Sequence, residues 1–438
     1  MCAVNDTLRK AGGVGFEAMS VVELDGRLDF DRLRTALLEL SHRHPVLTAK
    51  LRRHWTGHRW DWQSAEPLSC KRLTCSDDSM LRETLVEILN ESRDLSEQPG
   101  ISFYLIDIAG QRDVFVTRVN HTLVDHLSSQ LVFRELKQIL DGDADSAVKP
   151  VTNLAEKYRK SFSLVQRVMS FLPRLPATLF PGSTADSVAP GTLRCDRQSK
   201  ASPPQSVVVR QLTAEETTAA LVRARKLSRM PSTSMAVLTS AIRVFSRFAK
   251  RKTSNDVFRV GLGSEAIQQS LDEFHPQNLS TVIRLSLKEN ELENPAHCVK
   301  RLNNQLRTSL KTRSELAFLE LISEYRWCYP LVRLIAGRIA LHTFSFFYAF
   351  FRVTEKDYEE FAGLPVKHLS FFGPAWHPLG MTLLVTHFRD HIELTLTYLP
   401  DHLSAQDAER YCDEVIRELT GQIETRSIPG RKAASAAA

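Results

Sequence analysis

Apolar and polar side chains alternate with two different periods along the chain, and each period predicts one type of element. Over 30–40 the apolar positions recur every three or four residues, which predicts an amphipathic helix. A strand is expected before it, at 19–24, and Pro45 should end the helix. Asp29 or Asp31 lies near the helix start, where a carboxylate can cap free backbone N–H groups.

The rest of the first half has the same mixture of short strands and helices. The expected strands cover 46–51, 59–63, 101–108 and 113–119, and the expected helices cover 79–92 and 126–140. The last helix follows closely on the last strand, so the residues between them should form a strand-to-helix loop.

A change in composition divides the chain. From about 180 to 204 the residues are mainly Pro, Gly, Ser and Thr with little apolar periodicity, which predicts a linker. We therefore assign 1–180 to an N-terminal lobe, 181–205 to the linker, 206–425 to a C-terminal lobe and 426–438 to a disordered tail.

The second lobe has its own helix and strand signals. A strand is expected at 207–212, and Thr213-x-x-Glu216 has the form of a capping box at a helix start. A long helix should cover 233–250 and a final one 404–420. Residues 381–398 alternate in polarity around a turn, which predicts an antiparallel hairpin.

Length and composition limit the possible classes of protein. The 438 residues are roughly two to three times the usual size of one domain, which agrees with two lobes. The net charge of +6 is spread along the chain without a dense basic run, so we expect no nucleic-acid partner. A mild positive field suits an anionic thioester, an acidic carrier protein or an anionic membrane surface.

Cysteine usage and hydropathy bear on the compartment. The seven cysteines form no CxxC pair, which fits neither a disulfide framework nor a zinc knuckle. The sequence has no signal-peptide pattern and no uncharged apolar run of about 18 residues, the length of a membrane-spanning helix. We expect a cytoplasmic protein without a structural metal.

The most informative segment is the strand-to-helix loop with the sequence NHTLVDH, residues 120–126. A neutral histidine such as His121 can accept a proton from an alcohol or amine at neutral pH. Asp125 suits a plain helix cap, with Ser128 three residues on. A bare H-x-x-x-D pattern arises by chance about once in a chain of this composition, so its context decides its meaning.

That context is a family resemblance. The chain resembles the chloramphenicol acetyltransferase-like superfamily, which includes condensation domains of nonribosomal peptide synthetases, polyketide-associated acyltransferases, wax ester synthases and plant BAHD enzymes. Their HHxxxDG or HxxxD motif is matched by His121 and Asp125. Their RHPxL segment is matched by Arg43, His44, Pro45 and Leu47.

The second lobe is similar to the family more loosely. Residues 276–285 resemble the family's GxxxNxxPLR strand and include Asn278. Ser370 and Gly373 fall where many members carry SNxG. Trp376 either lines the substrate passage or packs between the sheets.

Two residues depart from the motif. Asn120 replaces the first histidine, and His126 replaces the glycine. Family members use that glycine where substrate passes close to the backbone. His126 would therefore narrow the passage, add a polar contact or mark a member without catalysis, and both residues are candidates for substrate contact.

The resemblance implies an α/β fold with two lobes, each a mixed sheet flanked by helices, and an active site in a tunnel at their interface. It implies that His121 removes a proton from an acceptor hydroxyl or amine, which attacks the thioester of an acyl-CoA or acyl carrier protein. Asp125 would hold the loop. Ser370 and Asn278 are candidate donors to the oxyanion. No metal and no cofactor beyond the thioester co-substrate are implied.

Two aromatic segments, 162–180 and 341–351, have an uncertain pattern. They form core, line a passage for a long acyl chain, or contact a membrane peripherally, in which case the acceptor is lipid-like. The chain is expected to be a monomer.

Three other interpretations follow from the same residues. A zinc hydrolase motif lacks a ligand, because Leu123 stands where its second histidine is needed. Gly261-Leu262-Gly263 lacks the third glycine of a dinucleotide loop and predicts a turn. A catalytically silent protein that binds a carrier protein or partner stays open as an alternative to the enzyme.

Overall fold

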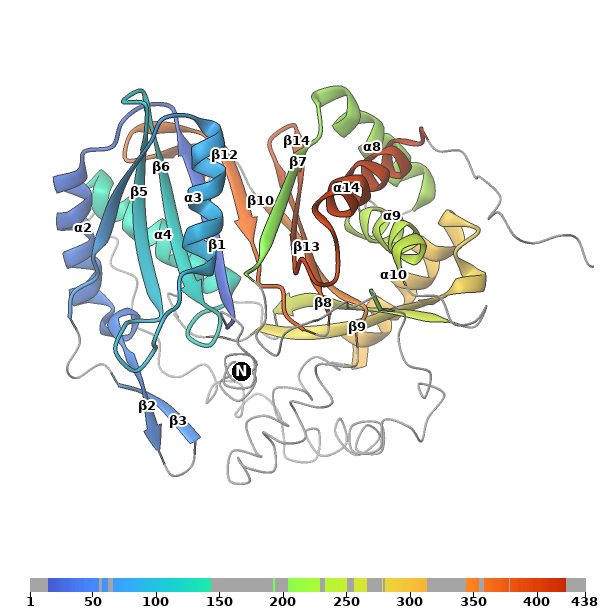
Figure 1. Ribbon diagram of the computed structural model, residues 1–438, viewed down its shortest axis with the longest axis horizontal. Coiled ribbons are helices and arrows are strands. Elements are labelled where there is room, and N and C mark those ends of the chain that lie inside the picture. Colours follow the sequence, from blue (N-terminus) through green and yellow to red (C-terminus); the bar gives the residue numbers. More distant parts are fainter. Residues whose placement is uncertain are drawn as a thin grey trace, which may run out of the picture.

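Two six-stranded mixed sheets organise the protein, one in each of two lobes that lie side by side (Figure 1). The structure is a computed structural model. It describes residues 15–54, 57–61, 66–142, 192–193, 204–228, 233–249, 256–265, 278, 280–312, 344–353, 358–377 and 379–422.

The described elements before residue 143 belong to the first lobe. They are β1 (Glu17–Leu24), α2 (Phe30–Arg43), a 3-10 turn (Pro45–Thr48), β2 (Lys50–His54), β3 (Gly57–Asp61), β4 (Cys70–Cys75), α3 (Asp78–Asn90), β5 (Ile101–Ile108), β6 (Arg112–Asn120) and α4 (His126–Asp141). Asp29 caps α2, because its side chain accepts hydrogen bonds from the N–H groups of Asp31 and Arg32. The strand expected at 46–51 is wrong in its first part, where Pro45 begins the 3-10 turn.

The sheet of the first lobe has the strand order β11-β12-β1-β6-β5-β4, in which β11 (Glu360–Phe361) and β12 (Leu364–Phe372) come from much later in the chain. Apolar residues of α2 and α4 share one buried cluster with one face of this sheet, and α3 packs with the other face. The edge strand β4 was not predicted, because it alternates too little to be seen in the sequence. It pairs in parallel with β5, so the sheet is mixed.

The second lobe also has a mixed sheet, but its described helices cover only one face. Its elements are β7 (Ser206–Gln211), α8 (Ala214–Leu227), α9 (Thr233–Phe248), β8 (Val257–Glu265), β9 (Ser280–Lys288), a 3-10 turn (Glu289–Glu291), α10 (Pro295–Thr312), β10 (Phe346–Val353), β13 (Met381–Phe388), β14 (His391–Tyr398) and α14 (Ala405–Thr420). The strand order is β7-β14-β13-β10-β8-β9. The capping box from Thr213 to Glu216 and the hairpin β13-β14 are confirmed.

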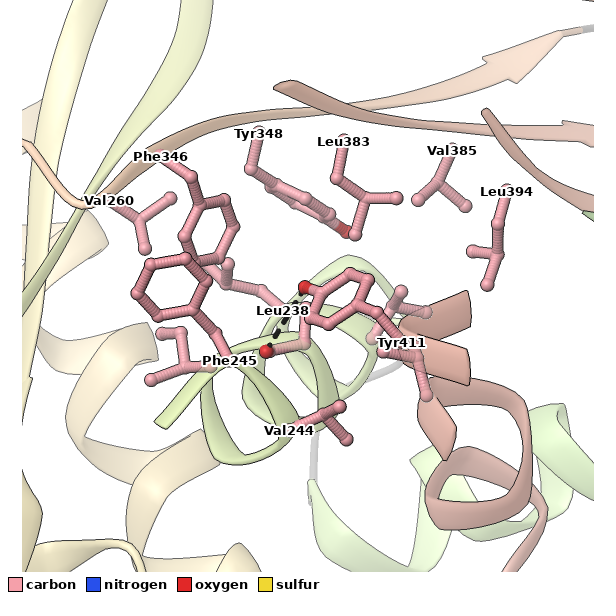
Figure 2. Packing of buried hydrophobic residues seen from close by; sticks show 14 of the residues in the cluster. Leu238, Val244, Phe245, Val260, Phe346, Tyr348, Leu383, Val385, Leu394 and Tyr411 are labelled. Carbon is pink, nitrogen blue, oxygen red and sulfur yellow. Dashed lines mark hydrogen bonds between the residues drawn. The ribbon is translucent and has the colours of Figure 1, made fainter. Parts of the chain in front are cut away.

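Alternation along the strands assigns the two faces of this second sheet. In β13, Leu383 and Val385 join the core beneath the helices, whereas Leu384 joins the core of the first lobe. Figure 2 shows the helix side, where Tyr348 and Leu383 lie above side chains of α9 and Tyr411 of α14. The Tyr411 hydroxyl donates to the Ala241 carbonyl at 3.2 Å. The opposite face of the sheet therefore meets the first lobe.

Two strands cross between the lobes. The strands β11 (Glu360–Phe361) and β12 (Leu364–Phe372) belong to the sheet of the first lobe, and β12 pairs antiparallel with β1. Our division, which gave all of 206–425 to the second lobe, is therefore corrected for these strands. Gly261 and Gly263 lie inside β8, so the turn expected there is wrong. The segments 162–180 and 426–438 lie outside the described residues.

Polar contacts between the lobes lie beside the crossing strand. His368 Nε2 on β12 lies 2.5 Å from Glu393 Oε2 on β14. Gln205, just before β7, exchanges two hydrogen bonds of 2.8 Å with the Asn90 side chain of α3. The Gln205 Oε1 also accepts from the Ala375 N–H. Polar contacts therefore tie the lobes at the middle of β12 and just after its end.

The His368 to Glu393 contact makes stability depend on pH. Burial alone would lower the pKa of His368, but the hydrogen bond and charge of Glu393 raise it above its ordinary value. The contribution is therefore complete below a pH of about 6.5 and is lost as the pH rises through the raised pKa. We expect His368→Gln to reduce the free energy of unfolding by about 1.5–3 kcal/mol at pH 6 and by less at pH 8.5.

Urea unfolding of both proteins across this pH range measures the difference. The exposed His391, replaced by Gln, is the matched control and should change the unfolding free energy little. A difference between wild type and His368→Gln that stays constant with pH would contradict the proposed ion pair.

Candidate active site

The candidate base lies where β6 ends and the chain turns toward α4. The His121 N–H donates to the Phe16 carbonyl at 2.7 Å, and the Asn120 N–H donates to the Gly100 carbonyl at 2.7 Å. The loop is therefore held by the chain segments next to β1 and β5, the strands on either side of β6. These bonds fix where the imidazole leaves the backbone.

Asp125 caps the helix that follows. Its side chain is fully buried and accepts a hydrogen bond from the Ser128 N–H at 2.8 Å. The cap closes the loop on its α4 side. Asp125 thus acts on the shape of the loop, as the sequence predicts.

Asn120 organises the loop from inside. Its Nδ2 donates to Glu17 Oε1 at 2.6 Å, and its Oδ1 accepts from the Thr122 N–H at 3.0 Å and the Thr122 hydroxyl at 2.5 Å. The side chain is 1% exposed. Because both amide atoms bind protein groups, the structure gives Asn120 a positioning role in place of the expected substrate contact.

A buried charge network lies beneath this loop, and the sequence analysis missed it. Glu17 Oε2 lies 3.2 Å from Arg118 Nε and 3.7 Å from Arg93 Nη1, and all three side chains are buried. Arg118 also contacts Glu91, whose Oε2 accepts from the Tyr104 hydroxyl at 2.5 Å. The only sequence signal is a glutamate directly before the apolar positions of β1.

The surroundings of His121 favour a neutral imidazole. Removal from bulk water lowers its pKa, and the carboxylates of Asp125 and Glu17 oppose this shift without cancelling it. Its Nδ1 is buried and makes no hydrogen bond among the described residues. At pH 7 the ring can therefore accept a proton, and two carboxylates stabilise the cation that forms.

The second lobe reaches the loop through Asn278. Its Nδ2 donates to the His121 carbonyl, and its Oδ1 accepts from the Ser280 N–H at 2.9 Å. We predicted this amide as a donor to the oxyanion. In the structure Asn278, which lies just before β9, binds the backbone of His121. It therefore positions His121 from the opposite lobe.

Of the other expected site residues, one lies beside the loop and two have no described contact with it. Trp376 packs edge-on against Phe16 at 5.1 Å between ring centroids, which places it beside the loop. Ser370 lies on β12 opposite Val21 of β1, and no described contact joins it to His121. Gly373 allows the chain after β12 to approach β13, because a Cβ there would lie 3.1 Å from a methyl group of Leu384.

His126 lies at the first position of α4 and contacts both lobes. Its ring centroid is 3.8 Å from that of Phe351 on β10 and 4.5 Å from that of Phe371 on β12. Burial lowers its pKa to about 3, with a smaller effect from His121. His126 is therefore neutral at pH 7 and fills space between the lobes.

The described part of the chain contains no group of three His, Cys, Asp or Glu side chains arranged to hold a metal ion. Within the same ranges no helix is both long and apolar enough to cross a membrane. The part of the aromatic segment that is described, from Phe344 on, contributes β10. Its alternate side chains face the core of the second lobe and the interface between the lobes.

Known proteins are similar to this chain in the sequence of the first lobe and in the fold of both lobes. The family model described as Condensation domain matches residues 10–159. Tyrocidine synthase 3 of Brevibacillus parabrevis is 25% identical over 160 residues, which are 36% of this chain and 2% of that protein. Nonribosomal peptide synthetase easA of Emericella nidulans is 29% identical over 128 residues, or 27% of this chain and 2% of that protein.

Solved structures extend the similarity beyond the first lobe. The first condensation domain of the calcium-dependent antibiotic synthetase, in complex with a substrate analogue, has a TM-score of 0.70 at 15% identity and covers 97% of each chain. A variant of the starter condensation domain of rhizomide synthetase in complex with C8-CoA has a TM-score of 0.67 at 13% identity, covering 96% of this chain and 94% of that one.

These similarities identify the fold of the protein. The chain has the two-lobed fold of condensation domains, and the resemblance to the chloramphenicol acetyltransferase-like superfamily is confirmed. It spans about 2% of the length of the synthetases that it matches in sequence. The tunnel implied by that resemblance stays a prediction.

The network under the loop can be tested through stability. Arg118→Met leaves the Glu17 carboxylate buried without its nearest cation, and we expect a loss of about 3–5 kcal/mol in unfolding free energy. Adding Glu17→Gln removes the unpaired charge and keeps an acceptor for Asn120, so it should recover part of this loss. Denaturant unfolding of the single and double variants measures both effects.

The matched control is Arg34→Met. Arg34 pairs with Asp31 on the surface of α2, with side chains 64% and 82% exposed, so its loss should change stability by less than about 1 kcal/mol. Equal losses in Arg118→Met and Arg34→Met would show that the buried network does not support the loop.

Proposed function

We propose that the protein is an acyltransferase in which His121 is the general base. The imidazole takes the proton of an acceptor hydroxyl or amine while the acceptor oxygen or nitrogen bonds to the thioester carbonyl carbon. The tetrahedral intermediate then collapses, the C–S bond breaks, and the proton passes to the departing thiolate. The products are an ester or amide and a free thiol, so no acyl-enzyme is required.

One observation carries this proposal above the others. A neutral histidine with a lowered pKa stands on a loop that backbone bonds hold in the first lobe and Asn278 holds from the second lobe. A base needs this combination of a free lone pair and a fixed position. Asp125 and Glu17 act through position and charge, because Asp125 caps α4 and Glu17 binds Asn120.

The similarity to condensation domains supports a proposal for the donor class. One structural neighbour is a complex with C8-CoA, and the sequence relatives are peptide synthetases. We propose a pantetheine thioester, on CoA or on a carrier protein, as the co-substrate, with no further cofactor. The acceptor is an alcohol or amine. A lipid-like acceptor, peripheral membrane contact, a monomeric state and a cytoplasmic location stay predictions.

The alternative function is a catalytically silent protein that binds a carrier protein or a biosynthetic partner. The observation that favours it is His126, which fills space next to the candidate base. The two functions differ in what the loss of His121 does. A silent protein has no turnover for that change to remove.

Thiol release provides the direct test of the enzyme. We expect wild type to release thiol from acyl-CoA or acyl carrier protein in the presence of mixed alcohols and amines, and His121→Ala to reduce kcat/KM by about 10²–10⁴-fold. The exposed His391→Ala is the matched control and should retain wild-type turnover. Thiol release that is equal in wild type and His121→Ala would refute the proposed base.

The pH dependence tests the electrostatics of the same residue. Because the pKa of His121 is lowered, kcat/KM should rise with pH along a limb centred below about 6.5 and stay level through pH 7. The charge of Glu17 raises this pKa, so Glu17→Gln should move the limb to still lower pH. A limb that does not move would show that Glu17 has no electrostatic influence on the base.

A further inference from the structure

His126 and two phenylalanines form a contact that bridges the lobes beside the candidate base. The pairwise centroid distances among His126, Phe351 and Phe371 are 3.8, 4.5 and 4.9 Å, so the three rings form one closed cluster. Each ring comes from a different element, α4, β10 and β12 respectively. We call these three residues the aromatic plug.

The plug lies close to His121. The two histidines are five residues apart on one loop and helix start, and the charge of His121 affects the titration of His126. Trp376 packs against Phe16, whose carbonyl accepts from the His121 N–H, and also against Phe347 at 5.0 Å. Aromatic side chains therefore pack at both ends of the loop that runs from His121 to His126.

The imidazole of His126 serves as a space-filling group. Its Nε2 lies 2.9 Å from Gln130 Nε2, which donates to it when the ring is neutral. With its pKa lowered to about 3 and its Nε2 lone pair bound by Gln130, His126 is a much weaker proton acceptor than an ordinary imidazole. What His126 changes is the shape of the site.

Paired strands carry both walls of the plug, which limits how far the walls can move together if the imidazole is removed. Phe371 is 3% exposed on β12, a strand paired with β1, and Phe351 lies on β10 in register with Thr386 of β13. A deletion between fixed sheets leaves a cavity. Because phenylalanine rings line this cavity, it suits an alkyl chain better than a polar acceptor.

We propose that the aromatic plug sets the length of the acyl chain that the site accepts, with His126 excluding the distal carbons of longer chains. This inference rests on the proposed acyl transfer. It assigns short acyl thioesters to the wild type and longer ones to a protein without the imidazole. Each additional methylene that is accommodated should tighten binding about fourfold.

Binding of unreactive S-alkyl-CoA thioethers with two to twelve carbons, measured by calorimetry, tests the inference without turnover. In His126→Gly we expect the affinity to continue rising at lengths where the wild-type affinity has levelled off or fallen. His126→Phe, which keeps the plug filled without ring nitrogens, should retain the wild-type length preference. His391→Gly, at the exposed first position of β14, is the control for the substitution itself.

A second measurement separates the cavity from the substrate. If the glycine variant has an empty imidazole site, added imidazole should raise its Tm and leave that of the wild type unchanged. Identical length preferences in wild type and His126→Gly would overturn the proposal, even if imidazole bound. If the wild type neither binds a thioether nor releases thiol from either donor, the proposed function fails first, and the plug loses its role with it.

Discussion

The geometry of the site depends on one strand that crosses from the second lobe into the first. β12 hydrogen-bonds to β1 from Met19 to Leu24, β1 pairs with β6, and β6 ends at the loop that carries His121. The next strand along the chain, β13, belongs to the second sheet again. Backbone hydrogen bonds thus connect the His121 loop to β12, and the chain connects β12 to the second lobe. Asn278 adds a direct side-chain contact between that lobe and the loop.

Two opposing electrostatic effects act on His121, the proposed base, which this frame positions. Enclosure keeps the imidazole neutral, which makes its lone pair available, but the same enclosure would disfavour the imidazolium that proton transfer creates. Asp125 and Glu17 oppose that penalty. Glu17 in turn is stabilised by Arg118 and Arg93, so the buried network supports both the loop's shape and the charge that forms on it.

The sequence predicts those elements whose pattern is local. The helices at 30–43 and 126–141, the hairpin β13-β14 and the cap at Asp125 follow from periodicity and capping rules. Sheet membership is different, because a strand such as β12 has the same alternation in either lobe. The partners of Glu17 are about 75 and 100 residues away, a separation that no local pattern encodes. Gly261 and Gly263 predict a turn locally, yet the pairing of β8 with β10 and β9 makes them part of a strand.

His126 shows why a departure from a motif needs the structure to be interpreted. From the sequence, a histidine in place of glycine favours blocked substrate access, a new polar contact or lost catalysis. In the fold its ring stays neutral, binds Gln130 and packs between Phe351 and Phe371, while the capped loop and neutral base beside it are intact. Histidine in place of glycine therefore reduces the free volume next to His121. The factors that act on the pKa of His121 are burial, Asp125 and Glu17, and His126 is not among them. A change confined to volume is one that an enzyme tolerates by taking a smaller substrate.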